Sequence, residues 1–399
     1  MKPYLDRSAF YLTCGALLSI LFSIAVSQIL LAFALAALLL SSGQIRLPPI
    51  KLPLALFLAA TVVSLLASGH IQEGMPQIRK FYVFFILLVT YSAFRNTSQI
   101  RAIVLLWTGI ATLSAARSFF QFWRIYQESQ AQHVSFYDFY VGSRITGFMS
   151  HWMTFGAEEM IVLLLLASYL FFSRERRWKR AAWLCAVILA CSMVLGFTRS
   201  IFLLGFPVGL LYLLWFWNKW LVAVVPAVVL IAVFVAPRAL RERVTSVVEP
   251  RAEVDSNRHR AILRETGEVI IRAHPWLGIG PEQVKYQSDR WIPKSDYPLP
   301  VGYYGHLHNL YLQYAAERGV PALLIFLWLI AKILWDFARA LRQKPTPEAR
   351  FILHGSIAAI LALLAEGYSE YNLGDSEVLT MFLAVVAFGY LAARQGMVE

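Results

Sequence analysis

The stretch AVILACSMVLGFTRSIFLLGFPVGLLY, residues 186–212, contains one charged side chain, Arg199, and is otherwise almost entirely apolar. A helix needs about 20 apolar residues to cross the hydrocarbon core of a membrane. With its apolar flanks the stretch is long enough for two spans, predicted at 181–198 and 200–217, with almost no loop between them. It therefore predicts a tight helical hairpin within a lipid bilayer, with Arg199 at its tip.

Similar apolar runs recur along the whole chain. Hydrophobic residues make up 58% of the sequence and the mean hydropathy is +0.58, which is typical of a polytopic membrane protein. We expect one all-α membrane domain over residues 1–399 with about twelve transmembrane helices. The predicted spans are two short helices within 8–40 that turn near residues 23–28, then 51–68, 78–94, 101–122, 151–173, 181–198, 200–217, 219–236, 309–338, 351–371 and 377–393.

The charge distribution gives an orientation. The chain carries 36 Lys and Arg against 24 Asp and Glu, but these basic residues lie between apolar spans, which argues against a nucleic-acid-binding face. In a twelve-span protein the basic short loops fall on one side: Arg46 with Lys51, Arg95 with Arg101, residues 174–180, Lys219 and residues 338–344. Lys and Arg favour the inside, so this side and both termini are predicted to be cytoplasmic.

Two longer loops fall on the opposite, outer side, a short one at 123–150 and a large one at 237–308. A loop of this size is where a polytopic protein is expected to keep its function. The large loop contains DSNRHRAILRETGEVIIRAHP, whose apolar spacing predicts a helix near 257–273 with Ser256 or Asn257 as N-cap.

Arginines of this predicted helix favour an anion site. Arg260 and Arg264 are four residues apart and share a face, and Arg258 lies at the helix start. Guanidinium groups match phosphate oxygens two at a time. Arg199 and Arg144 come from separate outer loops, so a lipid phosphate or diphosphate would explain all five together. The alternatives are a solvated mixed-charge loop and an Arg199 that merely reaches the membrane interface.

The segment GHLHNLYLQYAAERGVPALLIF, residues 305–326, places polar residues at the mouth of an apolar helix. Asn309 is a suitable N-cap, and Gln313 and Glu317 continue a polar stripe. On a helix, the two-residue offset would point His306 and His308 to nearly opposite sides. The helix dipole disfavours an imidazolium at this position, so we expect a neutral His308 that can act as a general base.

This segment has two other interpretations. His308 could simply cap a helix at the interface. A metal site formed by the two histidines is disfavoured, because no third ligand with suitable spacing is present. No DxD pattern occurs anywhere, and the three cysteines lie inside apolar runs with no disulfide or metal spacing. We therefore expect neither a metal nor another cofactor.

Four segments, in this order, resemble the O-antigen ligase and polymerase superfamily: RITGFMSHWMTFGAE at 144–158, GFTRS around Arg199, RAILRETGEVIIRAHPWLGIGPEQV at 260–284, and HNLYLQYAAERG, which ends at Gly319. The resemblance implies a GT-C-like, metal-independent, inverting glycosyltransferase of the bacterial inner membrane with its site facing the periplasm. The donor would be a glycan on undecaprenyl diphosphate, and the ligase acceptor a sugar hydroxyl of the lipid A core.

The resemblance also implies roles for individual residues. His308 matches the family's catalytic histidine, and Arg199 and Arg260 match its functional arginines. Position adds Arg258, Arg144 and His306, with Asn309, Gln313 and Glu317 as support for an acceptor cleft. Arg264 is a departure, because family members often carry an aromatic residue there; it would either strengthen the anion site or pack differently.

The superfamily leaves alternatives open. An O-antigen polymerase or a protein O-oligosaccharyltransferase would share the donor and the base and differ in the acceptor. The ligase is favoured because the chain has one large outer loop and no appended C-terminal domain to hold a protein acceptor. A flippase for lipid-linked glycan would need arginines along a path through the bilayer, whereas these gather at one face, with Arg117 and Glu158 as exceptions.

Overall fold

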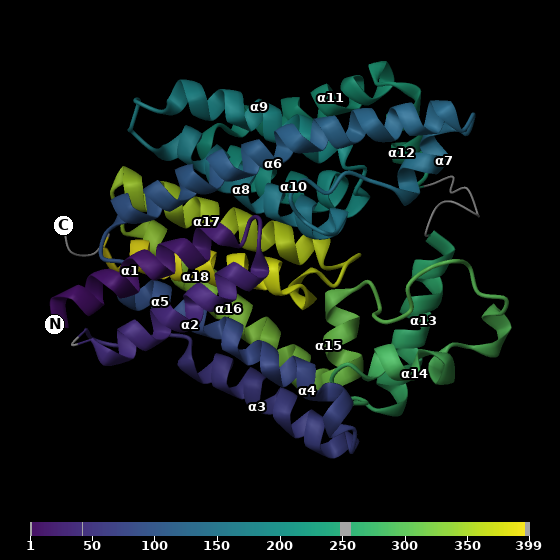
Figure 1. Ribbon diagram of the computed structural model, residues 1–399, viewed down its shortest axis with the longest axis horizontal. Helices are drawn as coiled ribbons and strands as arrows, with labels where there is room; N and C mark the ends of the chain where they lie inside the picture. Colours follow the sequence, from purple (N-terminus) through teal and green to yellow (C-terminus); the bar gives the residue numbers. More distant parts are fainter. Residues whose placement is uncertain (1, 42, 248–256, 396–399) are drawn as a thin grey trace.

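The computed structural model describes residues 2–41, 43–247 and 257–395, and the regular secondary structure of these ranges is entirely helical. The predicted all-α fold is therefore confirmed. Long helices run side by side, both termini lie at one end of the bundle, and α13 and α14 lie at the other (Figure 1). We call the second end the site end.

The helices of the bundle are α1 (Lys2–Ser19), α2 (Ile24–Leu40), α3 (Lys51–Ser68), α4 (Ile71–Arg79) with η1 (Lys80–Phe84) and α5 (Phe85–Ala93), α6 (Thr97–Ala131), α8 (Trp152–Phe172), α9 (Lys179–Leu195), η2 (Ser200–Gly205) with α10 (Phe206–Trp217), α11 (Lys219–Val235), α16 (Val320–Arg342), α17 (Pro347–Glu366) and α18 (Ser376–Gln395). The site end adds α7 (Phe136–Gly142), α12 (Arg238–Thr245), α13 (Asn257–Ala273), α14 (Gln283–Trp291), η3 (Lys294–Asp296), α15 (Leu310–Arg318) and η4 (Asn372–Gly374).

Within the described ranges, seven helices are long and apolar enough to cross a membrane: α3, α6, α8, the η2–α10 pair, α16, α17 and α18. A multi-pass membrane protein is therefore confirmed. The other five predicted spans correspond to α1, α2, the α4–α5 segment, α9 and α11, which are shorter, more polar or interrupted. The number twelve stays a prediction.

The centre of the bundle is formed by α8, α17 and α18, which are buried along most of their length. Small residues allow the neighbouring helices to approach. A Cβ atom at Gly209 of α10 would lie 2.9 Å from the carbonyl oxygen of Ala358 in α17. Close backbone approach of this kind is typical of helix packing in membranes. By contrast, α3, α10 and α16 expose large apolar side chains such as Leu66, Trp215 and Trp328, which suits a lipid-facing surface.

Several predicted boundaries differ from the structure. The first hairpin turns at residues 20–23, where the Ser23 hydroxyl caps α2, slightly before the predicted turn. The predicted span 78–94 is broken into α4, η1 and α5. The predicted loop at 123–150 contains the last turns of α6 and the whole of α7.

The largest difference concerns the predicted span 309–338, which is two helices. The chain breaks between α15 and α16 at Gly319, whose φ is +85°. A Cβ atom there would lie 2.1 Å from the carbonyl oxygen of Trp276, so only glycine permits this crossing. The prediction of one continuous span was wrong, and α15 belongs to the site end.

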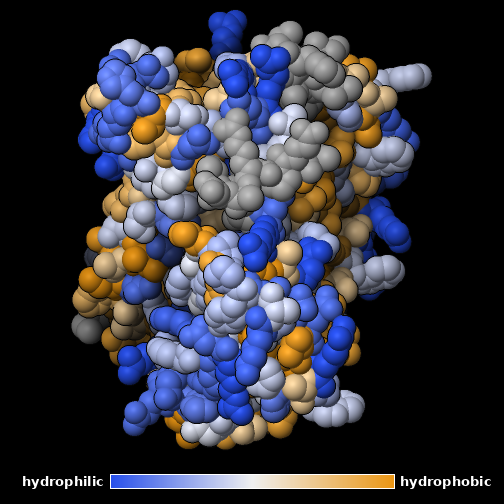
Figure 2. All heavy atoms as spheres, turned by 90° about the vertical axis from the view of Figure 1, so that its right-hand side faces the viewer, coloured by the Kyte–Doolittle hydropathy of each residue, from blue (hydrophilic) through white to orange (hydrophobic). Residues whose placement is uncertain are grey.

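Of the large loop 237–308, the described residues 257–308 fold as a helical cap over α15, whereas α12 packs against α7 and α11. The predicted helix near 257–273 is confirmed as α13, whereas the proposed N-cap Ser256 lies outside the described residues. Leu263, Ile270, Val284 and Leu307 form a small apolar core between the cap and α15. Backbone hydrogen bonds from Ile279 to Ala316 and from Gly280 to Glu317 fasten the cap. The face of the site end is largely hydrophilic (Figure 2).

Candidate functional site

The start of α15 is fixed by hydrogen bonds from two directions. The Asn309 side chain accepts from the N–H groups of Tyr311 and Leu312, both at 2.9 Å, so the predicted N-cap is confirmed. The Asn309 amide also donates to the carbonyl of Tyr368 at 2.7 Å, and the Leu310 N–H donates to the carbonyl of Gly367 at 2.7 Å. The residue before the cap, His308, is therefore held against the connection between α17 and α18.

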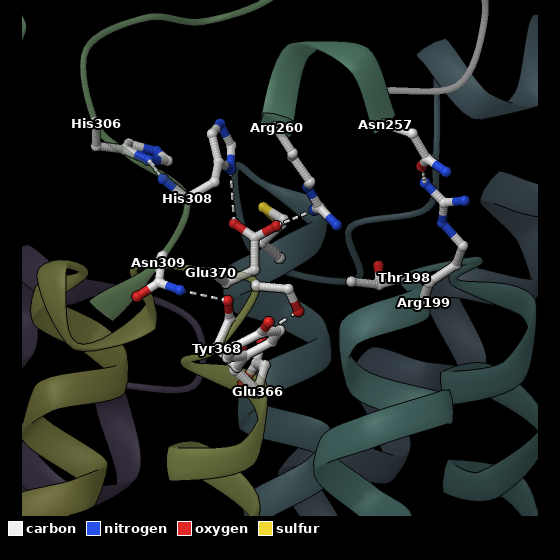
Figure 3. A network of polar contacts seen from close by, with 12 residues as sticks. Thr198, Arg199, Asn257, Arg260, His306, His308, Asn309, Glu366, Tyr368 and Glu370 are labelled. Atoms are coloured by element: carbon white, nitrogen blue, oxygen red, sulfur yellow. Dashed lines mark hydrogen bonds and ion pairs between the residues drawn. The ribbon is translucent and has the colours of Figure 1, made fainter. Parts of the chain in front are cut away.

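His308 itself has one ring nitrogen engaged and one without a partner. Its Nδ1 atom lies 2.9 Å from Oε2 of Glu370, while its Nε2 atom is buried and has no hydrogen-bond partner among the described residues (Figure 3). A carboxylate can only accept, so the proton of a neutral ring is held on Nδ1 and the lone pair is on Nε2. His308 also has φ +46°, an uncommon backbone conformation that often marks functional positions.

Glu370 joins His308 to an arginine. The second oxygen of its carboxylate, Oε1, forms an ion pair with Arg260 of α13. Burial by itself raises the pKa of Glu370, but Arg260 and His308 more than offset this, and the pKa lies below its usual value. The side chain is therefore a buried carboxylate that bridges two cationic or potentially cationic groups.

Sequence reasoning missed Glu370, because it fell at the end of the predicted span 351–371. A signal was present: Glu366 and Glu370 are four residues apart at the end of an apolar run. Ionisable residues in such a position are functional hypotheses by default.

The predicted separation of His306 and His308 was wrong. Their ring centroids lie 4.1 Å apart, and Nδ1 of His306 accepts from the backbone N–H of His308 at 3.2 Å. The reason is that this segment is not helical, so helical spacing does not apply. Burial and then the neighbouring His308 lower the pKa of His306 to about 3. His259, which sequence reasoning also missed, packs 5.3 Å from His308, and the same two causes lower its pKa to about 4.

The predicted arginines of α13 separate into two groups. Arg260 and Arg264 both reach the α17–α18 connection, since Arg264 lies 4.9 Å from the ring centroid of Tyr368. Their shared face is confirmed. Arg258 instead donates to the carbonyls of Asp296 and Pro298 at 3.4 and 3.5 Å, within the cap. The structure therefore does not bring Arg258 to His308.

Arg199 is buried where the hairpin turns into η2, a π-helical turn of a kind frequent at functional sites. It donates to the Ser246 carbonyl at 2.9 Å, to the Ser246 hydroxyl at 3.0 Å and to Oδ1 of Asn257 at 2.7 Å. The side chain thus links the hairpin to the end of α12 and the start of α13. Figure 3 shows it on the same side of His308 as Arg260.

Further positive charge surrounds this position. Arg144 lies 5.0 Å from the ring centroid of Trp152, and burial followed by the fields of Arg243 and Arg260 lowers its pKa to about 9. Arg243, which sequence reasoning missed, is buried and donates to the Phe197 carbonyl at 2.9 Å. The positive potential that Arg243 and Arg260 create at Arg144 would favour an anion bound beside Arg144.

The predicted polar stripe of α15 borders the pocket beside His306. Gln313 accepts from the N–H of Leu307 at 2.7 Å, and Glu317 is buried, which raises its pKa to about 7. Gln313, Glu317 and His306 line one pocket of about 160 Å³. Among the described residues no group of three or more His, Cys, Asp or Glu side chains could hold a metal ion.

Comparison with known proteins gives one family. Residues 184–327 match the family model described as O-antigen ligase. The matched stretch contains Arg199, Arg260 and His308 and ends before Glu370. No curated protein matches the chain.

Proposed function

Because the chain carries an O-antigen ligase family domain, we propose that it transfers a glycan from undecaprenyl diphosphate to a sugar hydroxyl of the lipid A core. The observation that carries the proposal is the state of His308. Its Nδ1 is engaged by a buried carboxylate, and its Nε2 has no hydrogen-bond partner in the part of the chain that the structure describes, as a general base requires.

His308 takes the proton of the acceptor hydroxyl on Nε2 while the oxygen attacks the anomeric carbon, with inversion. Glu370 is a positioning residue. It holds the ring and its tautomer and stabilises the imidazolium that forms, as a buried carboxylate does in catalytic triads.

The arginines act on the leaving group. Negative charge grows on the diphosphate as the bond to the sugar breaks, and Arg260, Arg199 and Arg144 are grouped where they would stabilise it. Such preorganised charges are commonly worth roughly 3–4 kcal/mol each. As His308 becomes cationic it competes with Arg260 for Glu370, which leaves Arg260 more strongly available to the diphosphate. This division of labour requires no metal ion.

We further infer that the site faces the periplasm from a bacterial inner membrane, with both termini in the cytoplasm. Two observations support this orientation. The basic short loops favour the cytoplasmic side. The termini lie at the end of the bundle away from α13 and α15 (Figure 1).

The experiment that tests the function is a transfer assay. Purified protein receives lipid-linked glycan and rough lipopolysaccharide in the presence of a chelator, with His308→Ala protein as the control. Ligated lipopolysaccharide is the expected product. A strict requirement for a divalent metal would contradict the mechanism.

The acceptor is tested separately. The same reaction is run with core lipopolysaccharide, with a second lipid-linked glycan repeat, or with a pilin-like protein. Product from the repeat alone would make the protein a polymerase, and product from the pilin alone would make it a protein O-oligosaccharyltransferase.

A further inference from the structure

The pocket beside His306 is polar and assembled from distant parts of the chain. It has a volume of about 160 Å³ and lies where α4, α14, α15 and η4 meet. The residues that matter for its chemistry are Gln77, Tyr303, His306, Gln313, Tyr371 and Asp375. Several of its polar side chains are buried, although they line open space: Gln77 is 7% exposed and Gln313 is 2% exposed. The Gln77 amide is already hydrogen-bonded, since it donates to Glu282 at 2.7 Å and accepts from Arg318 at 3.1 Å. Gln313 is therefore the buried side chain of the two that can serve a ligand.

The lining combines hydrogen-bond donors, acceptors and aromatic rings. Gln313 offers its amide nitrogen, because its oxygen is engaged by Leu307. Asp375 offers an acceptor, and Thr154 donates to its Oδ2 at 2.9 Å, which orients the carboxylate. The ring of Tyr303 packs edge-on against His306 at 5.2 Å. Hydroxyl groups both donate and accept, and the faces of a sugar ring pack against aromatic side chains, so this mixture suits a sugar.

The charge and polarity of the lining argue against binding of the other parts of the substrates, the phosphates and the acyl chains. Two lysines, Lys80 and Lys285, are balanced by the acids Glu282, Glu317 and Asp375 in the lining. A phosphate would need an excess of cations, such as the one around Arg260. An acyl chain would need an apolar lining.

The pocket is next to His308 through His306, which forms part of its wall. Figure 3 shows His306 on one side of His308, and Arg260 and Arg199 on the other. In an inverting displacement the attacking oxygen and the leaving group are on opposite sides of the anomeric carbon. The pocket wall formed by His306 is therefore on the side from which an acceptor must approach.

We propose that this pocket binds an uncharged sugar ring of the acceptor and presents its hydroxyl to His308. The assignment of the acceptor side rests on the proposed function, since it takes His308 as base and the arginines as the diphosphate site. Tyr303 supplies the aromatic surface, and Gln313 and Asp375 select the hydroxyl pattern.

Steady-state kinetics test the pocket. Tyr303 is half-exposed, so Tyr303→Ala removes the ring without opening the core. We expect the acceptor KM to rise roughly three- to tenfold, as the loss of an aromatic contact implies, with the donor KM unchanged. Tyr303→Phe keeps the ring and should restore the wild-type KM. Tyr286→Ala is the matched control, because Tyr286 is equally exposed in the same cap and does not line the pocket.

A binding measurement separates the pocket from the reaction. Delipidated core oligosaccharide is added to His308→Ala protein, and contact is followed by saturation-transfer NMR. Signal that disappears with Tyr303→Ala in the same background supports the pocket. Unchanged signal, or kinetics in which Tyr303→Ala alters the donor KM instead, would overturn it. If the wild-type protein ligates no glycan, the proposed function fails, and this binding measurement still decides whether the pocket takes a sugar.

Discussion

Replacing Glu370 by glutamine isolates what the buried carboxylate contributes. The change keeps the size of the side chain and removes its charge. Its amide can donate to Nδ1 of His308, which would move the ring proton to Nε2, the atom proposed to take the proton of the acceptor hydroxyl. We expect this variant to fold and bind both substrates but to transfer glycan very slowly.

The size of the effect follows from the contacts. A hydrogen bond to a charged group is worth roughly 1.5–3 kcal/mol, so losing the contact to the forming imidazolium alone costs about 10- to 100-fold in kcat. The tautomer of His308 with its proton on Nε2 lowers kcat further. A carboxylate-to-amide change beside a catalytic histidine costs about 10⁴-fold in serine proteases. The expected loss for Glu370→Gln lies between about 10² and 10⁴.

The assay measures kcat and both KM values on purified protein. Glu366→Gln is the matched control, since Glu366 is a buried carboxyl one turn earlier that accepts from Asn372 at 3.0 Å and has no contact with His308. Its kcat should change by less than about threefold. If Glu370→Gln retains kcat within threefold of wild type while folding normally, Glu370 does not position the base.

Three further predictions concern other parts of the structure. Arg260→Ala should raise the donor KM by about 10- to 100-fold through loss of a charge-assisted contact. Arg272 is an exposed arginine of the same helix, so Arg272→Ala should leave the donor KM unchanged. If Arg260→Ala alters only the acceptor KM, the anion site is assigned to the wrong substrate. Gly319→Ala should lower the melting temperature strongly or prevent accumulation of the protein in the membrane, because a Cβ atom would meet the Trp276 carbonyl at 2.1 Å. A melting curve like that of the wild type would contradict this close approach of the two backbones. Finally, the depressed pKa of Glu370 means that its ionised form stabilises the fold above about pH 4.3, the ordinary glutamate value. The difference in melting temperature between wild type and Glu370→Gln should therefore shrink as the pH falls through and below this value, and a difference independent of pH would contradict the linkage.

Local signals in the sequence were sufficient for much of the helical framework. The spacing of apolar residues predicted α13, and the side chain of Asn309 predicted the start of α15. Apolar runs predicted a multi-pass membrane protein, because lipid imposes its length requirement on each helix separately. The shared face of Arg260 and Arg264 also followed from helical periodicity alone.

The parts that could not be predicted depend on contacts between distant segments. The break at Gly319 reflects the close approach of Trp276, which no local pattern reports. The contact between the two histidines depends on the positive φ of His308, which helical spacing does not contain. Glu370 reaches His308 from 62 residues further along the chain, so their pairing becomes visible only once α17 and α18 are packed.

The anchoring of α15 to the α17–α18 connection has a consequence for biogenesis. During synthesis, the arginines, the cap and His308 are translated and reach the membrane first, and Glu370 follows only afterwards. The Gly367 carbonyl, which accepts from Leu310, also arrives with that late segment. A nascent chain that has inserted α16 therefore carries every residue of the matched family stretch, yet its histidine has neither its anchor nor its carboxylate. If Glu370 positions the base as proposed, competence for transfer is acquired only at the last hairpin, and a prematurely terminated chain should be inert and not partly active.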